Sequence, residues 1–125
     1  MVTDLKALRS EIKKEIKQKL LTKRYKKIEK KQEEIAQNLF MVQHELTETI
    51  RCFYGLQKVS SNWYIENDSV IMNFRWLDQE MTLRSEDRRP VLEGCPKRLR
   101  RYFLRQPNVI EFMLLDHEYS LLYLI

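Results

Sequence analysis

The residues best suited to chemistry in this chain are two histidines and two cysteines, and their spacing forms no recognisable site. His44 and His117 lie far apart, and Cys52 and Cys95 stand alone without C-x-x-C spacing. Metal sites and catalytic groups that can be read from sequence repeat such residues at short, characteristic intervals. The 2 glycines are too few for a phosphate-binding loop, and the acidic clusters show no metal-ligand pattern. We therefore expect no enzyme, no metal and no cofactor, with reduced thiols in an intracellular protein.

Basic residues offer a second kind of candidate chemistry, the binding of nucleic acid. Between Glu11 and Lys31 the chain has ten Lys or Arg and three Glu, a net charge of +7. A second basic group at 97–105 includes Tyr102 and Phe103, which could stack on bases while the cations bind phosphates. The candidate contacts are Lys23, Arg24, Lys26, Lys27, Lys97, Arg98, Arg101 and Arg105. The alternative is that both groups are solvated helix faces, and spacing favours a core position for Phe103.

The elements that must position these residues begin with a long helix, because neither glycine nor proline occurs before Gly55. Steps of four and three residues create an apolar seam, which predicts pairing with a partner helix in a coiled coil. The expected pairing residues are Leu21, Tyr25, Ile28, Gln32, Ile35, Leu39, Val42, Leu46 and Phe53. We expect the best packing between Ile35 and about Leu56. Tyr25 and Gln32 favour a different partner chain over a second copy.

An earlier apolar series does not join this seam smoothly. It steps mostly by four residues through Leu8, Ile12, Ile16 and Leu20, and the seam then restarts at Leu21. Such a shift predicts a stutter or a local break in the supercoil. The lysine-rich turns that follow should be the weakest part of the coil, because like charges four residues apart repel each other.

A small antiparallel sheet is expected after Gly55. Residues 63–65 and 70–76 flank a turn-forming cluster, and alternation at 81–84 adds a third short strand. The 86–90 segment is expected to end the sheet, since Pro90 cannot continue a central strand. Trp63 and Trp76 are either hairpin core or candidate docking residues for a partner.

Two helices should complete the chain. Pro96 suits the first turn of one, and Pro107 ends it. The 108–125 tail allows a helix or two strands; Asn108 followed by Glu111 resembles a capping box and favours the helix. The predicted fold is therefore α+β, with a long N-terminal coiled-coil helix at 1–54 and a globular domain at 55–125. No apolar run is long enough to span a membrane.

Four segments carry a resemblance to a known family. They are Phe53-Tyr54-Gly55-Leu56 at the coil exit, the 70–78 strand, Leu92-Glu93-Gly94, and the 105–114 segment. In this order they resemble the RWD-type heads that end kinetochore coiled coils, in the small subunits of the microtubule-binding complex and in the spindle-checkpoint scaffold protein. This chain departs from the family in two ways. The heads of the family usually have more strand sequence before their first C-terminal helix, and the basic coil of this chain is unusual among them.

The resemblance implies a dimer, in the nucleus or on chromosomes, whose paired heads dock a peptide or helix of another kinetochore component. No residue-level binding site transfers with it. The expected function is thus a non-enzymatic adaptor that pairs through its coil and docks other subunits with its head. The alternative is a coiled-coil protein that binds nucleic acid through the 13–31 and 97–105 stretches.

Overall fold

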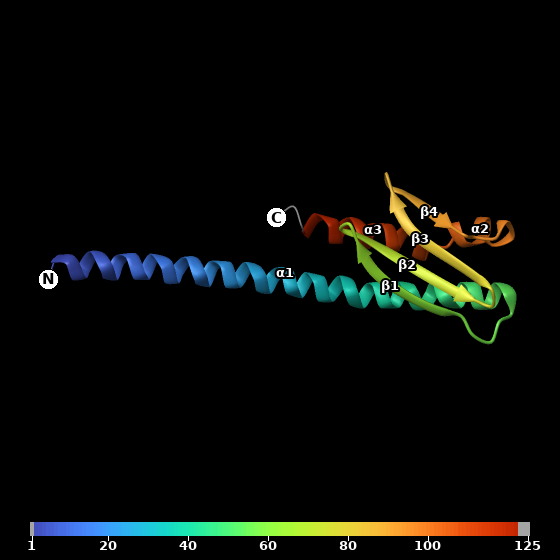
Figure 1. The fold of residues 1–125 in the computed structure, drawn as a ribbon, viewed down its shortest axis with the longest axis horizontal. Coiled ribbons are helices and arrows are strands. Elements are labelled where there is room, and N and C mark those ends of the chain that lie inside the picture. Colours follow the sequence, from blue (N-terminus) through green and yellow to red (C-terminus); the bar gives the residue numbers. More distant parts are fainter. Residues whose placement is uncertain (1, 123–125) are drawn as a thin grey trace. The chain divides into compact units, whose positions relative to one another are not determined.

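The computed structural model describes residues 2–122, with side chains from Leu5 onward. The long helix α1 (Val2–Tyr54) precedes four strands and two further helices. The strands are β1 (Ser60–Glu66), β2 (Ser69–Trp76), β3 (Gln79–Glu86) and β4 (Arg89–Glu93), and the helices are α2 (Lys97–Leu104) and α3 (Pro107–Leu121). Figure 1 shows this order along the chain. The predicted α+β class is confirmed, and so is a helix in place of two strands near the C-terminus.

Two compact units divide the chain, residues 1–33 and residues 34–125. We call the first the N-terminal helix unit and the second the head. The expected boundary at residue 54 differs from this division, because the head includes the last part of α1. That helix ends as predicted, where Gly55 adopts a φ of +65° and the Leu56 amide donates to the Arg51 carbonyl at 2.9 Å.

The sheet of the head is an antiparallel meander in the order β1-β2-β3-β4. Short turns join the strands, and positive φ angles at Asn67 and Asp68, and again at Asp87 and Arg88, are typical of tight hairpins. The sequence did not predict β4, which contains Pro90 opposite Ser85. A proline is tolerated there because β4 is an edge strand and needs hydrogen bonds on one side only.

One face of the sheet packs against all three helices and forms the core of the head. Figure 1 shows the head's part of α1 and α3 lying behind the strands. The buried core residues are Ile35, Leu39, Val42, Leu46 and Ile50 from α1, Val70, Met72, Phe74, Trp76, Met81, Leu83 and Leu92 from the sheet, Leu99 and Phe103 from α2, and Val109, Phe112 and Leu115 from α3. Ser61 joins α1 to β1 by accepting from Gln43 Nε2 at 2.9 Å. The helix α1 is therefore as much a core element of the head as the sheet is.

The helix α3 begins one residue earlier than its predicted cap. Pro107 occupies the first turn and Gln106 is the N-cap residue, without a side-chain capping bond. The capping box expected at Asn108 and Glu111 is therefore wrong. Proline at the first helical position replaces it, because its fixed φ suits a helix start.

Candidate interaction surfaces

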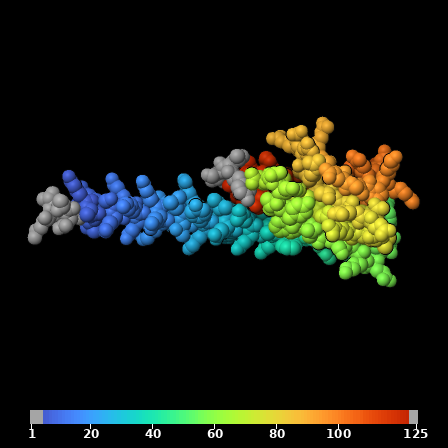
Figure 2. Space-filling view, in the orientation of Figure 1, coloured from blue at the N-terminus to red at the C-terminus, as the bar shows by residue number. Residues whose placement is uncertain are grey.

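The N-terminal helix unit exposes a large amount of apolar surface. Seven large apolar side chains of this unit are between 47% exposed, at Ile12, and 65% exposed, at Tyr25. They are Leu5, Leu8, Ile12, Ile16, Leu20, Leu21 and Tyr25. Figure 2 shows side chains of this unit standing out singly along the helix. A surface helix of a globular protein normally buries such residues against another element.

These exposed residues lie on two different faces of one helix. Leu20 and Leu21 are consecutive, so their side chains point about 100° apart around a helix of 3.6 residues per turn. Leu5, Leu8, Ile12, Ile16 and Leu20 share one face, which we call the distal stripe. Leu21 instead begins the predicted seam. The helix α1 itself runs without interruption through both residues.

The structure corrects the role of the second half of the seam. Ile35, Leu39, Val42 and Leu46 are buried in the core of the head, with Leu39 and Leu46 at 0% exposure. Phe53 is half-buried against the same core. These five side chains are covered by the chain's own sheet and helices, so they are not available to a partner helix. Of the other four predicted pairing residues, Leu21 and Tyr25 are exposed, and Ile28 and Gln32 are half-buried.

The distal stripe is the feature that the predicted pairing set left out. Its signal was present in the sequence as steps of three and four residues from Leu5 to Leu20. The longer seam that begins at Leu21 has more regular heptad spacing. Pairing was therefore predicted for the seam and not for the distal stripe. Periodicity alone does not say which of two stripes is buried within the chain.

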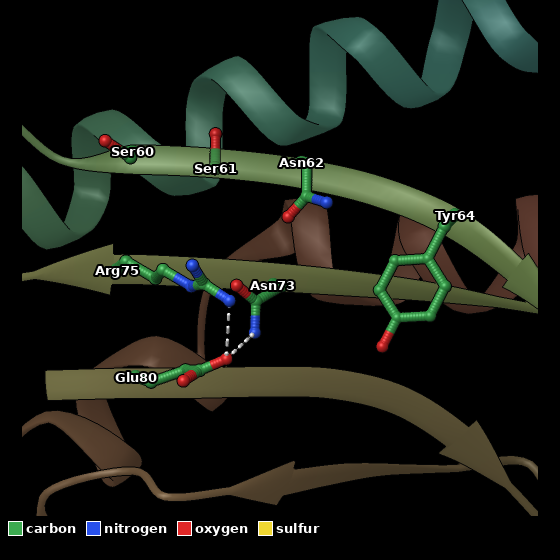
Figure 3. Close-up of a pocket in the computed structure, with 7 residues that line it drawn as sticks. All are labelled: Ser60, Ser61, Asn62, Tyr64, Asn73, Arg75 and Glu80. Atoms are coloured by element: carbon green, nitrogen blue, oxygen red, sulfur yellow. Dashed lines mark hydrogen bonds and ion pairs between the residues drawn. The ribbon is translucent and has the colours of Figure 1, made fainter.

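The face of the sheet opposite the helices is polar and internally paired. Figure 3 shows part of it, a hollow of about 300 Å³ lined by residues of β1, β2 and β3. Asn73 Nδ2 donates to Glu80 Oε1 at 3.0 Å, and Arg75 forms an ion pair with the same oxygen at 3.2 Å. Tyr64 borders this hollow, with its ring on the face away from α1 (Figure 3). Glu80 pairs with both Asn73 and Arg75, so these three polar side chains partner one another within the sheet.

The two tryptophans have different surroundings. Trp76 is only 4% exposed and its ring stacks on Tyr54 at 5.8 Å, so it is core, and the docking role considered for it is wrong. Trp63 is half-buried, and Phe40 meets it edge-on at 5.7 Å. Phe40 is itself exposed, so the Trp63–Phe40 pair keeps an accessible apolar side on the head.

The basic residues of α2 point outward. Leu99 and Phe103 are buried, as the spacing favoured for Phe103, while Lys97, Arg98, Arg101 and Arg105 are exposed. The ion pairs among the described residues join arginines of α1, β2 and β3 to glutamates and include none from α2. The other candidate contacts, Lys23, Arg24, Lys26 and Lys27, are exposed in the N-terminal helix unit.

Titratable groups with a shifted pKa serve structural contacts. Asp116 is buried, and its Oδ1 accepts from the Val70 amide at 2.7 Å. Burial raises the pKa of Asp116, against the opposing effect of that hydrogen bond. Burial also raises the pKa of Cys95, whose thiol donates to the Pro96 carbonyl at 3.4 Å. Both shifts follow from desolvation of the charged form.

Comparison with protein-family models, with curated proteins and with solved structures finds no match to this chain. Among residues 2–122 no group of three or more His, Cys, Asp or Glu could hold a metal ion. In the same part of the chain no helix is long and apolar enough to cross a membrane.

Proposed function

We propose that this chain is a non-enzymatic assembly protein. Its N-terminal helix unit pairs with a partner helix, and its head presents further docking surface. The observation that carries the proposal is the distal stripe, a row of large apolar side chains that stays about half exposed. Burying one Leu or Ile side chain contributes about 1.5–3 kcal/mol, so a partner that covers this stripe gains substantial stability.

The charge of the N-terminal helix unit supports the same proposal. Lysines four residues apart, such as Lys23 and Lys27, repel each other and weaken an isolated helix by a few tenths of a kcal/mol. Isolated helices in water are marginal, and tertiary packing supplies most helical stability in proteins. A partner helix would therefore stabilise this unit in addition to burying its apolar stripe.

The chain has a long helix, then an antiparallel sheet, then two helices. The resemblance to kinetochore heads rests on this same order. We extend the proposal to an assembly of that kind, on chromosomes, in which the heads bind other subunits. Tyr25 and Gln32 lie outside the distal stripe, so they do not decide whether its partner is another protein or a second copy of this chain. The Trp63–Phe40 pair is the candidate docking point on the head.

Site-specific photo-crosslinking tests the pairing in cells that naturally contain the protein. A photoreactive phenylalanine derivative at position 8 lies on the distal stripe, and the same derivative at position 14 lies on the opposite face. We expect one defined protein adduct from position 8, none from position 14, and loss of the adduct in the Ile12→Asp/Ile16→Asp variant. Equal labelling from both positions, or none from position 8, would contradict pairing through the stripe.

A second candidate function is nucleic-acid binding, which the exposed cations of α2 favour, since none of them forms an ion pair among residues 5–122. Its affinity should fall by roughly one power of salt concentration for each phosphate contacted. Arg98→Glu/Arg101→Glu and Lys23→Glu/Lys27→Glu should each weaken binding in a gel-shift titration. An absence of binding at low salt removes this function and leaves the pairing proposal intact, because apolar pairing depends only weakly on salt.

A further inference from the structure

The helix α3 carries a second apolar stripe that the head does not cover. Its buried side contributes Val109, Phe112 and Leu115 to the core. On its outer side Ile110 is 63% exposed, Leu114 59% and Leu121 44%. These three residues are four and seven positions apart, so they form one row along the helix. We call this row the α3 stripe.

Acidic residues border the α3 stripe. Glu111 and Glu118 are exposed and lie seven residues apart, which places them on one side of the row. No Lys or Arg occurs anywhere in α3. A helix that packs on this stripe would therefore gain from carrying cations at matching positions along one of its own sides.

The distal stripe of the N-terminal helix unit has that matching pattern. Lys6 and Lys13 are exposed and border the distal stripe. They are seven residues apart, as the two glutamates are, which corresponds to about 10.5 Å along a helix. When each helix is viewed from its own N-terminus, the two lysines lie on the same side of the distal stripe as the two glutamates do of the α3 stripe. Corresponding sides of two helices meet when the helices pack antiparallel, so this packing brings the opposite charges together.

We propose that the N-terminal helix unit of a second copy of this chain packs antiparallel on the α3 stripe. Lys13 of the second copy then lies opposite Glu111, and Lys6 opposite Glu118. The apolar side chains supply most of the binding energy, and the charge pairs set the direction. This inference rests on the proposed function, because it names the helix with which the N-terminal unit pairs. A closed two-fold dimer would contain the contact twice.

The oligomeric state of the purified full-length chain tests this inference. Sedimentation equilibrium over a range of concentrations should show a dimer that dissociates on dilution. The Ile110→Asp/Leu114→Asp variant should be monomeric. Both residues are exposed, so the head should keep its fold, which circular dichroism checks. Met41→Asp, at an exposed position of α1 within the head, is the matched control and should remain dimeric.

Charge exchange tests the direction of packing. Glu111→Lys/Glu118→Lys and Lys6→Glu/Lys13→Glu should each weaken the dimer about tenfold or more, as like charges then face each other. The four substitutions combined should restore most of the affinity. Lys27→Glu/Lys31→Glu makes the same change in net charge outside the contact and should leave the dimer unchanged.

Three outcomes would overturn the inference, and they affect the proposed function differently. A wild-type chain that stays monomeric removes the second copy as occupant, but pairing with another protein stands. A dimer that resists the α3 substitutions and is lost in Ile12→Asp/Ile16→Asp pairs through two distal stripes, which also leaves the proposed function standing. A dimer that survives both sets of substitutions, together with no crosslink from position 8, removes both.

Discussion

At the scale of single residues, Asp116 shows how this head uses a buried charge. Its carboxylate accepts the Val70 amide at the start of β2, and Ser120 Oγ donates to the Asp68 carbonyl nearby at 3.1 Å. Together these bonds attach α3 to the β1–β2 hairpin. Burial raises the pKa of Asp116, so the folded state holds a proton more tightly than the unfolded state does. The contribution of this residue to stability therefore falls as pH rises from 3.8 through the raised pKa.

Two substitutions of Asp116 separate its hydrogen bond from its charge. Asp116→Asn keeps an acceptor oxygen and removes the charge, so we expect it to be at least as stable as wild type at neutral pH. Its unfolding free energy should also lack the fall with rising pH that the raised pKa of Asp116 predicts for wild type. Asp116→Ala leaves the Val70 amide without this partner and should cost about 1–3 kcal/mol. Urea unfolding across a pH series measures both; an Asn variant as unstable as the Ala variant would contradict this account.

At the scale of elements, the sequence predicted most of the fold because local signals agreed with it. Gly55 marked the end of α1, and alternation at 70–76 marked β2. The strand β4 was missed because Pro90 reads as a stop, and an edge position is visible only once the order of the strands is known. The distal stripe was visible but was not distinguished from the seam.

The seam itself was the largest error, for a physical reason. A heptad-like pattern shows which side chains share a helix face, but a partner helix and the chain's own sheet can cover that face equally well. In this protein the core of the head, built from the sheet and the other two helices, covers it from Ile35 onward. The sequence left a core role and a docking role open for Trp76, because an aromatic residue in a strand suits both, and its burial shows the core role.

Alanine substitutions on the two parts of α1 should therefore differ in effect. Leu46→Ala removes a fully buried side chain and should lower the unfolding free energy of the head by about 2–5 kcal/mol. Ile16→Ala removes an exposed side chain and should change it by no more than about 0.5 kcal/mol when measured on dissociated protein. Urea unfolding at low protein concentration checks both. If both substitutions changed the unfolding free energy by equally small amounts, Leu46 would not be a core residue of the head, and its seam would pair between molecules instead.

At the scale of the whole molecule, the sign of the charge divides the chain. Residues 5–33 contain twelve Lys or Arg and four Glu, a net charge of +8, whereas residues 34–125 have eleven cations and thirteen anions. Each unit also carries an uncovered apolar stripe, on α1 and on α3 respectively. Opposite charge beside two apolar stripes favours association between copies over separate solvated units.

The division into units predicts that the head folds without the N-terminal helix unit. A chain of residues 30–125 keeps every buried residue of α1, together with one helical turn before Ile35 to absorb fraying at the new end. It should be monomeric, because it lacks the distal stripe.

The unfolding free energy of this shortened chain should lie within about 0.5 kcal/mol of that of full-length Ile12→Asp/Ile16→Asp, in which the unit is present but unpaired. Wild type should exceed both as protein concentration rises, since association stabilises the folded state by mass action. Urea unfolding at several concentrations measures all three, and a shortened chain that is unfolded in buffer would show that the N-terminal helix unit is part of the folding domain.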